Sequence, residues 1–230
     1  MLIIQTCDPF RYFPLFAITQ RTAAVYAERN GHQYEAFVGI CRGHRPWHAT
    51  YNRILLLKQL ITRGARGWVL YLDADSYITD LRFDMQNYLG GRMDCSFIFA
   101  PAVPNAKPWQ VNAGIFFANL SNDKCLRVCE QWYADFMTRV SDETLANNKG
   151  SFDIYPDDQQ LIQSIIEGSD AEIQNSIYVD QDQTFNYEGG KFARQVIRAH
   201  FTSFDARLES AQSEIGEILT NSRDELTGSL

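Results

Sequence analysis

The stretch GWVLYLDADSYITD, residues 67–80, joins a run of apolar residues to two aspartates that are one residue apart. The run from Trp68 to Leu72 is almost wholly apolar, which predicts a strand buried on both faces. Such strands belong to α/β sheets, in which ligands bind beyond the carboxyl ends of the strands. Asp73 and Asp75 lie at that end. Because alternate residues of an extended segment point the same way, both carboxylates are expected to face one target.

Outside this stretch, short apolar runs alternate with segments of helical periodicity. Strands are predicted at residues 2–7, 34–40, 97–100 and 114–118, and helices at residues 13–29, 49–61, 125–137 and 158–166. This order predicts a single α/β domain with parallel strands. Residues 101–110 and 141–151 have the composition of loops. The main domain is expected to span residues 1–207, followed by an acidic C-terminal helix or tail at residues 208–230.

The composition is that of a globular protein and argues against several kinds of partner. With 230 residues, of which 45% are hydrophobic, the chain is long enough to bury a sizeable core. A net charge of -7 without any basic block argues against nucleic acid or an anionic membrane as partner. No apolar run approaches the roughly 20 residues of a membrane span, and the start of the chain lacks a signal peptide. These features predict a cytoplasmic protein without a transmembrane segment.

The five cysteines are scattered along the chain, and only two of them are close in sequence. They are Cys7, Cys41, Cys95, Cys125 and Cys129. We interpret all five as free thiols without a metal or redox role.

The paired aspartates need a positive partner. Two like charges about 4 Å apart repel by roughly 4 kcal/mol at an effective dielectric near 20. The segment from Trp68 to Leu81 contains no Lys or Arg that could offset this repulsion. A divalent cation bound through oxygen ligands, Mg²⁺ or Mn²⁺, is therefore the expected partner of Asp73 and Asp75. The alternative interpretation is that both carboxylates cap the turn that follows.

Two other families also place aspartates at this spacing. A calcium loop of the EF-hand type requires Gly at its sixth position and Glu at its twelfth, but Ile78 and Asp84 stand there. That interpretation is excluded. A haloacid-dehalogenase-like phosphatase would use Asp73 as nucleophile, although such enzymes carry Thr or Val where this chain has Tyr77. The phosphatase remains an alternative.

Six segments, read together and in order, resemble one group of enzymes. They are QTCDPFRY (5–12), ATYNRILL (49–56), YLDADSYI (71–78), NAGIFFANL (112–120), DDQQLI (157–162) and AHFTSF (199–204). They are similar to motifs of retaining glycosyltransferases of the GT-A fold, in the family of glycogenin and the lipopolysaccharide glucosyl- and galactosyltransferases. A second similarity is to the α-1,2-galactosyltransferase and xyloglucan xylosyltransferase family. The resemblance implies a GT-A-like α/β domain with a mixed, mostly parallel sheet flanked by helices.

The resemblance also implies an activity and a set of site residues. The expected reaction is the metal-dependent transfer of a hexose or pentose from a UDP-sugar to a hydroxyl acceptor, with retention of configuration. The metal ligands would be Asp73, Asp75 and His200, which places the aspartates in a DXD motif. The residues expected to hold the nucleotide sugar are Thr6, Cys7, Asp8, Tyr12, Arg53, Asp73, Ala74, Asp75, Asn112, Ala113, Gly114 and Arg207. The residues expected at the reacting sugar are Asp157, Asp158 and Gln159.

These last three residues would have distinct roles. Asp158 would bond the hydroxyls of the donor sugar, and Gln159 would lie near its anomeric carbon. A general base such as Asp157 would be required only if the enzyme inverted the configuration.

The chain departs from the family pattern after His200. The family carries Gly three residues and Lys six residues after this His, whereas Ser203 and Ala206 stand here, with Arg207 as the nearest substitute for the Lys. Cys7 also replaces the usual Asn. These differences leave a second function open, that of a sugar-nucleotide-binding module without catalysis.

Overall fold

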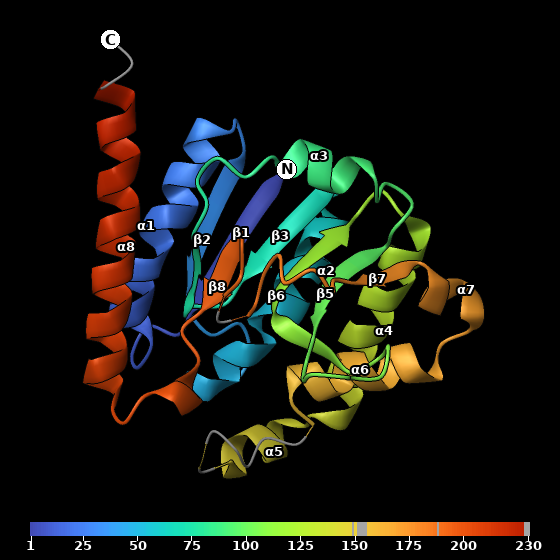
Figure 1. The fold of residues 1–230 in the computed structure, drawn as a ribbon. Coiled ribbons are helices and arrows are strands. Elements are labelled where there is room, and N and C mark those ends of the chain that lie inside the picture. Colours follow the sequence, from blue (N-terminus) through green and yellow to red (C-terminus); the bar gives the residue numbers. More distant parts are fainter. Residues whose placement is uncertain (149, 151–155, 188, 228–230) are drawn as a thin grey trace.

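A six-stranded sheet forms the centre of the protein (Figure 1). The structure is a computed structural model that describes residues 1–148, 150, 156–187 and 189–227. The strands follow the order β2, β1, β3, β6, β5, β7 across the sheet. Their bounds are Leu2–Cys7 (β1), Gln33–Val38 (β2), Trp68–Leu72 (β3), Phe97–Pro101 (β5), Val111–Asn119 (β6) and Ile177–Val179 (β7). Two short strands, β4 (Ser76–Ile78) and β8 (Ala193–Gln195), pair with each other outside this sheet.

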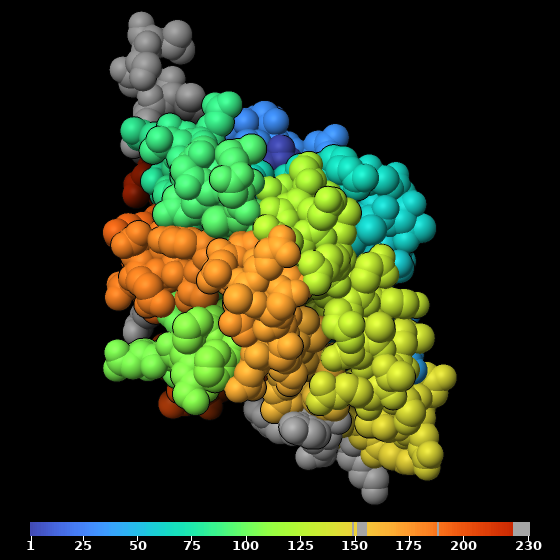
Figure 2. Space-filling model, turned by 90° about the vertical axis from the view of Figure 1, so that its right-hand side faces the viewer, coloured from blue at the N-terminus to red at the C-terminus, as the bar shows by residue number. Residues whose placement is uncertain are grey.

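Helices cover both faces of the sheet (Figure 1). One face packs against α1 (Phe13–Arg29) and α3 (Met85–Gly90), and the other against α2 (Asn52–Thr62), α4 (Asp123–Arg139) and α6 (Asp158–Gly168). The remaining helical segments are η1 (Pro46–Tyr51), α5 (Asp142–Asn147), α7 (Ala171–Asn175), η2 (Arg198–His200) and α8 (Phe204–Thr227). Figure 2 shows the side on which α4 (yellow-green) lies beside the segment of α6, α7 and β7 (orange).

The sheet is mixed, as the resemblance implied. β1 pairs in parallel with β2 and β3, and β5 pairs in parallel with β7. β6 runs antiparallel to both β3 and β5. The parallel direction that the alternation of strands and helices predicted does not hold for β6. The loop between β5 and β6 carries no helix, and a parallel connection would need a longer crossover.

The apolar run of β3 is buried on both faces, as predicted. Val69 and Tyr71 belong to the core cluster beneath α2, α4 and α6. Leu70 and Leu72 belong to the cluster beneath α1 and α3. Burial of each large apolar side chain contributes about 1.5–3 kcal/mol. The strand that leads to the two aspartates is thus anchored from both sides.

The longer predicted elements are confirmed, with ends that differ by a few residues. The predicted loop at residues 141–151 is wrong in part, because α5 occupies residues 142–147 and is capped by the Ser141 side chain; residues 149 and 151 lie outside the described residues. Sequence periodicity did not reveal β4, β7, β8, α3 and α7. These elements have three to six residues, which is too short for a period to be recognised.

The C-terminal helix α8 begins at Phe204, ahead of the predicted boundary at residue 207, and packs along α1 (Figure 1). Ala211 and Ile215 of this helix join an apolar cluster with Leu15 of α1. The first part of α8 therefore belongs to the same folded unit as the sheet.

All five cysteines are unpaired, as predicted. Three of them are buried, and Cys41 and Cys95 are partly exposed. Among the described residues, no helix has both the length and the apolar character that crossing a membrane requires.

A buried glutamine in β1 holds the turn that carries the two aspartates. The Gln5 amide donates to the carbonyl oxygens of Asp73 at 3.0 Å and Ser76 at 2.8 Å. The side-chain oxygen Oε1 of Gln5 accepts from the Tyr34 hydroxyl at 3.1 Å. Because Gln5 is fully buried, these bonds form away from water and fix the turn to the sheet.

Replacing Gln5 by Leu is expected to lower the free energy of unfolding by about 2 kcal/mol, because hydrogen bonds to the turn carbonyls are lost inside the protein. Urea denaturation followed by circular dichroism measures this change. Gln33→Leu, at an exposed position of β2, is the matched control and should change stability by less than about 0.5 kcal/mol. Equal stabilities of the two variants would contradict the anchoring role of Gln5.

Candidate functional site

The carboxyl ends of β1 and β3 lie side by side, because these strands pair in parallel with Gln5 opposite Leu72. The residues that follow the two strands meet at one edge of the sheet, where α/β proteins bind ligands. A cavity of about 320 Å³ opens there, a size typical of small-molecule sites. The predicted site residues that line it are Thr6, Cys7, Asp8, Tyr12, Arg53, Asp73, Ala74, Asp75, Asp157 and Asp158.

Asp73 has an arginine as its partner. The Arg53 guanidinium donates to Asp73 Oδ1 at 2.5 Å, and the Tyr71 hydroxyl donates to the same oxygen at 3.3 Å. Burial raises the pKa of Asp73 above its ordinary value, while Arg53 acts in the opposite direction. The Asp73 side chain keeps 24% of its surface exposed, so it still faces the cavity.

Arg53 itself is shared between two carboxylates. Besides Asp73, it pairs through Nε with Asp158 Oδ2 at 3.0 Å and donates to the Ala113 carbonyl oxygen. Burial alone would lower the pKa of Arg53, but Asp158 and Asp73 together raise it, so the guanidinium stays charged. Arg53, which the resemblance placed at the diphosphate, does line the cavity. Its guanidinium, however, is already bonded to Asp73, Asp158 and the Ala113 carbonyl.

Asp75 is paired with a second arginine. The Arg207 guanidinium donates to Asp75 Oδ2, and the Gln195 amide donates to Oδ1 at 2.8 Å. The Asp75 backbone carbonyl accepts from the Val196 amide at 2.8 Å. Both side-chain oxygens and the backbone of Asp75 are thus bonded to the C-terminal part of the chain.

The sequence predicts a metal because the local segment around the two aspartates contains no Lys or Arg. That step of the inference is wrong. The aspartates do have positive partners, Arg53 and Arg207, which lie outside the local segment from Trp68 to Leu81. A count of basic residues within a local segment cannot detect them, because the fold brings distant parts of the chain together.

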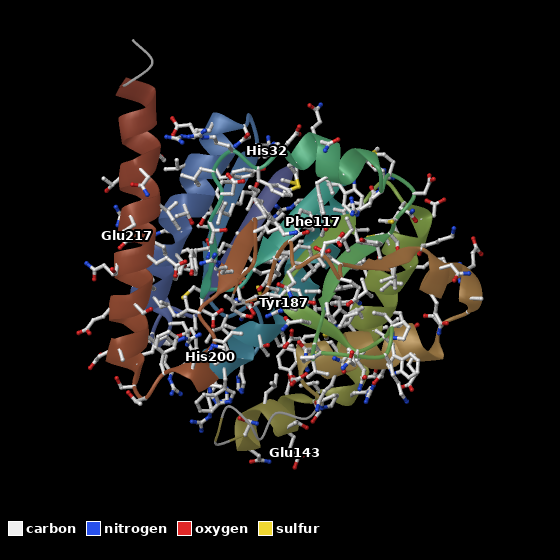
Figure 3. All side chains as sticks on the ribbon, in the orientation of Figure 1. His32, Phe117, Glu143, Tyr187, His200 and Glu217 are labelled. Atoms are coloured by element: carbon white, nitrogen blue, oxygen red, sulfur yellow. The ribbon has the colours of Figure 1, made fainter. Side chains whose placement is uncertain are left out.

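The donor groups around Asp75 do not fit a divalent cation. Among the residues that the structure describes, no three His, Cys, Asp or Glu side chains form a cluster able to hold a metal ion. The predicted ligand His200 is exposed, and it lies at the end of the molecule where α8 begins (Figure 3). The structure therefore does not bring Asp73, Asp75 and His200 together as one cluster, and Arg207 pairs with Asp75 instead.

The loop after β1 is folded around Asp8. Its carboxylate accepts from the backbone amides of Phe10 at 2.8 Å, Arg11 at 2.6 Å and Tyr12 at 3.1 Å. Such a turn fixes the entry into α1. The Cys7 thiol donates to the Asp8 carbonyl oxygen at 2.8 Å, and burial raises the pKa of this thiol. Asp8 thus shapes the cavity wall, where the sequence predicted a contact with the nucleoside.

The start of α6 carries the residues predicted to act on the sugar. Asp157 caps the helix by accepting from the Gln160 amide at 2.7 Å. Asp158 is buried and bonded to Arg53 and to the Thr50 hydroxyl. The Gln159 side-chain oxygen Oε1 accepts from the Ala113 backbone amide at 3.0 Å. Asp157 and Asp158 reach the cavity, whereas Gln159 lies behind this lining.

The start of β6 packs closely against Gln195. Asn112 Oδ1 accepts from the Gly114 amide at 2.7 Å. A Cβ on Gly114 would lie 2.8 Å from the Gln195 side chain, so a larger residue at position 114 would push Gln195 away from Asp75. Asn112, Ala113 and Gly114 therefore support the site from behind the cavity.

Several lining residues were not predicted. Arg11, Thr50, Gln195 and Arg198 all face the cavity. Arg198 donates to the Tyr12 hydroxyl at 2.6 Å. The only signal for Arg198 was its position directly before the AHFTSF segment. Gln195 lies in none of the motifs.

No family model matches this sequence, and no curated protein matches it. Solved structures do resemble the fold. A glycosyltransferase involved in glycosylation of the major capsid of PBCV-1 superposes with a TM-score of 0.64 at 13% identity, over 92% of this chain and 98% of that chain. GlyE from Streptococcus pneumoniae TIGR4 gives 0.60 at 12% identity, over 97% of this chain and 63% of that one. The galactosyltransferase LgtC, in complex with donor and acceptor sugar analogues, gives 0.52 at 12% identity, over 94% and 96%.

This chain has the GT-A fold. The fold class implied by the sequence motifs is thereby confirmed. In this fold, β1 and β3 supply the edge at which the cavity opens, and the pair of β4 and β8 brings Gln195 beside Asp75.

A buried histidine fixes the η1 segment of this GT-A domain, which forms part of the cavity wall. His48 Nδ1 accepts from the backbone amides of His44 at 3.0 Å and Arg45 at 3.3 Å. Gly43 adopts a φ of +98°, and a Cβ there would lie 2.2 Å from His48 Nδ1. Burial, together with His44 and Arg45, lowers the pKa of His48 to about 4.

Stability is expected to fall on acidification through His48. An unfolded histidine has a pKa of about 6.5, so below that value the unfolded chain binds a proton that the folded chain resists until about 4. The denaturation midpoint should therefore drop as the pH falls from about 6.5 to about 4. His48→Asn keeps an acceptor near the Nδ1 position without titrating and should show a smaller drop. Identical pH profiles for the two proteins would contradict this role.

Proposed function

We propose that this protein is a glycosyltransferase that moves a sugar from a nucleotide-sugar donor to a hydroxyl acceptor. The observation that carries the proposal is the cavity at the carboxyl edge of β1 and β3, which gathers the DXD aspartates, Arg53 and the start of α6. The GT-A fold and the motif resemblance support it. A UDP-hexose or UDP-pentose as donor and a carbohydrate hydroxyl as acceptor are the specific form of this proposal.

The charges around the cavity suit the breaking of a bond between a sugar and a phosphate. As that bond breaks, negative charge builds on the leaving diphosphate, and cations that face it lower the barrier. Arg11 and Arg198 are exposed and line the cavity. Guanidinium groups bond phosphate oxygens in a bidentate manner. These two arginines are therefore the groups that we assign to the diphosphate.

The proposed stereochemistry is retention, as the resemblance implies. In that case a departing phosphate oxygen takes the proton of the acceptor hydroxyl on the same face of the sugar, and the chain need not supply a base. We also propose a cytoplasmic location, because free thiols are typical of a reducing compartment. The metal dependence predicted from the sequence is not part of this proposal, since both aspartates have arginine partners.

The alternatives have less support. In a phosphatase, Asp73 would have to attack a phosphate, yet its Oδ1 is held by Arg53. A binding module without catalysis is favoured by one observation, namely that both oxygens of Asp158 are bonded to protein groups. That observation makes turnover, and not binding alone, the decisive measurement.

A panel of UDP, GDP, ADP and CMP, tested by thermal shift with both Mg²⁺ and Mn²⁺ present, is expected to show preferential stabilisation by UDP. A ligand at 100 times its dissociation constant adds about 2.7 kcal/mol to the stability of the folded state. Release of UDP from UDP-sugars, with and without an acceptor pool, then measures turnover. Binding without release in any mixture would identify a binding module. Absence of stabilisation by every nucleotide would overturn the proposed function.

Replacing Asp157 by Asn separates the two stereochemical courses. Asn caps a helix about as well as Asp, so the fold should be retained. Burial and Asp158 raise the pKa of Asp157, which would suit a general base. Under retention the rate of UDP-sugar turnover should stay within about threefold of the parent, whereas loss of a general base costs about a hundredfold or more. The anomeric configuration of the product, read by NMR, provides the independent check.

A further inference from the structure

Arg207, in the first turns of α8, is enclosed beneath the cavity. Only 2% of its side chain is exposed. Its Nε donates to the Val196 carbonyl oxygen at 2.6 Å, and its Nη2 donates to Asp75 Oδ2. The guanidinium carbon lies 5.3 Å from the centroid of the Tyr12 ring, within reach of a cation–π contact. The head group is thus held by a carbonyl, a carboxylate and an aromatic ring.

Both oxygens of Asp75 already accept a hydrogen bond, and one of these bonds comes from a cationic group that repels a metal ion. Oδ1 accepts from Gln195, and Oδ2 accepts from Arg207. A divalent metal requires oxygen ligands at about 2.0–2.6 Å. The Arg207 guanidinium is in direct contact with Asp75 Oδ2, and the described part of the chain has no cluster of three possible ligands.

We propose that Arg207 takes the place of a metal ion at Asp75, so that this chain binds the diphosphate of its donor without a divalent cation. This inference rests on the proposed function for the identity of the ligand. On the protein side, the fixed charge of Arg207 neutralises Asp75, which would otherwise repel an incoming phosphate. On the ligand side, the exposed guanidinium groups of Arg11 and Arg198 face the phosphates.

The Arg207 side chain is fixed in its position by the packing of α8. Val196 lies in one apolar cluster with Ala211 and Ile215 of α8 and with Leu15 of α1. The carbonyl that accepts from Arg207 therefore sits against the helix that carries it. Displacing the guanidinium would break its bonds to Val196 and Asp75 and disturb this packing. The arrangement fits a permanent counter-ion.

Binding of Mn²⁺ alone, followed by electron paramagnetic resonance, tests this assignment without any nucleotide. The parent protein should bind Mn²⁺ no better than Asp75→Asn. Arg207→Met, which removes the charge and keeps an apolar stem, should bind at least about tenfold more tightly, because a free carboxylate becomes available. Arg207→Lys should restore the weak binding of the parent. Tight binding of Mn²⁺ by the parent that Asp75→Asn abolishes would overturn the proposal.

The double variant Arg207→Met/Asp75→Asn controls for unfolding caused by an unpaired buried charge. Removing both members of a buried ion pair leaves no unpaired charge, so it is better tolerated than removing one. The double variant should bind Mn²⁺ as weakly as the parent. If Arg207→Met does not fold, the comparison of the parent with Asp75→Asn still decides the question.

UDP binding by calorimetry, in EDTA and in Mn²⁺, tests the consequence for the ligand. The dissociation constant should change by less than about twofold, since two ligands without coupling do not alter each other's affinity. Arg198→Gln should weaken UDP binding about tenfold and leave uridine unaffected. Arg63→Gln, exposed after α2, is the control and should change neither. A requirement for Mn²⁺ would overturn this inference and leave the proposed function standing. If UDP does not bind in either buffer, the proposed function fails. The Mn²⁺ experiment then still decides whether Arg207 takes the place of a metal at Asp75.

Discussion

Two buried arginines neutralise the carboxylates that gather at the edge of this sheet. Arg53 bonds Asp73 and Asp158, and Arg207 bonds Asp75. Removing one partner of a buried ion pair costs about 3–5 kcal/mol, because the remaining charge is left without compensation. The carboxylates, the strand that presents them and the helices that bear the arginines are consequently tied into one arrangement. The cavity wall depends on it, since Arg53 also holds the Ala113 carbonyl.

The GT-A architecture explains why these groups meet. The parallel pairing of β1 and β3 sets the two loops after them side by side, and Gln5 fastens the turn of the aspartates to the sheet. The β4 and β8 ladder then carries Gln195 to Asp75. Chain segments from the beginning, middle and end of the sequence thus contribute to one small volume.

Much of the fold was predictable, because β3 and the longer helices carry strong hydrophobic patterns. The apolar run before Asp73 indicated a doubly buried strand, and the structure confirms it. The antiparallel course of β6 was missed by periodicity, which reports burial and carries no information on strand direction. The position of the cavity followed from the sheet rule and from the motifs. The partners of the aspartates did not, because a pairing such as Arg207 with Asp75 depends on where α8 docks.

The separation of these partners along the chain bears on how the protein is made. Arg207 follows Asp75 by 132 residues, whereas Arg53 precedes Asp73 by only 20. During synthesis Asp75 leaves the ribosome long before Arg207, so its carboxylate lacks this counter-charge until α8 emerges. A message truncated ahead of residue 204 would yield a polypeptide without the closing contacts of Ala211 and Ile215, and we expect such a product to be cleared by cellular proteolysis before it accumulates.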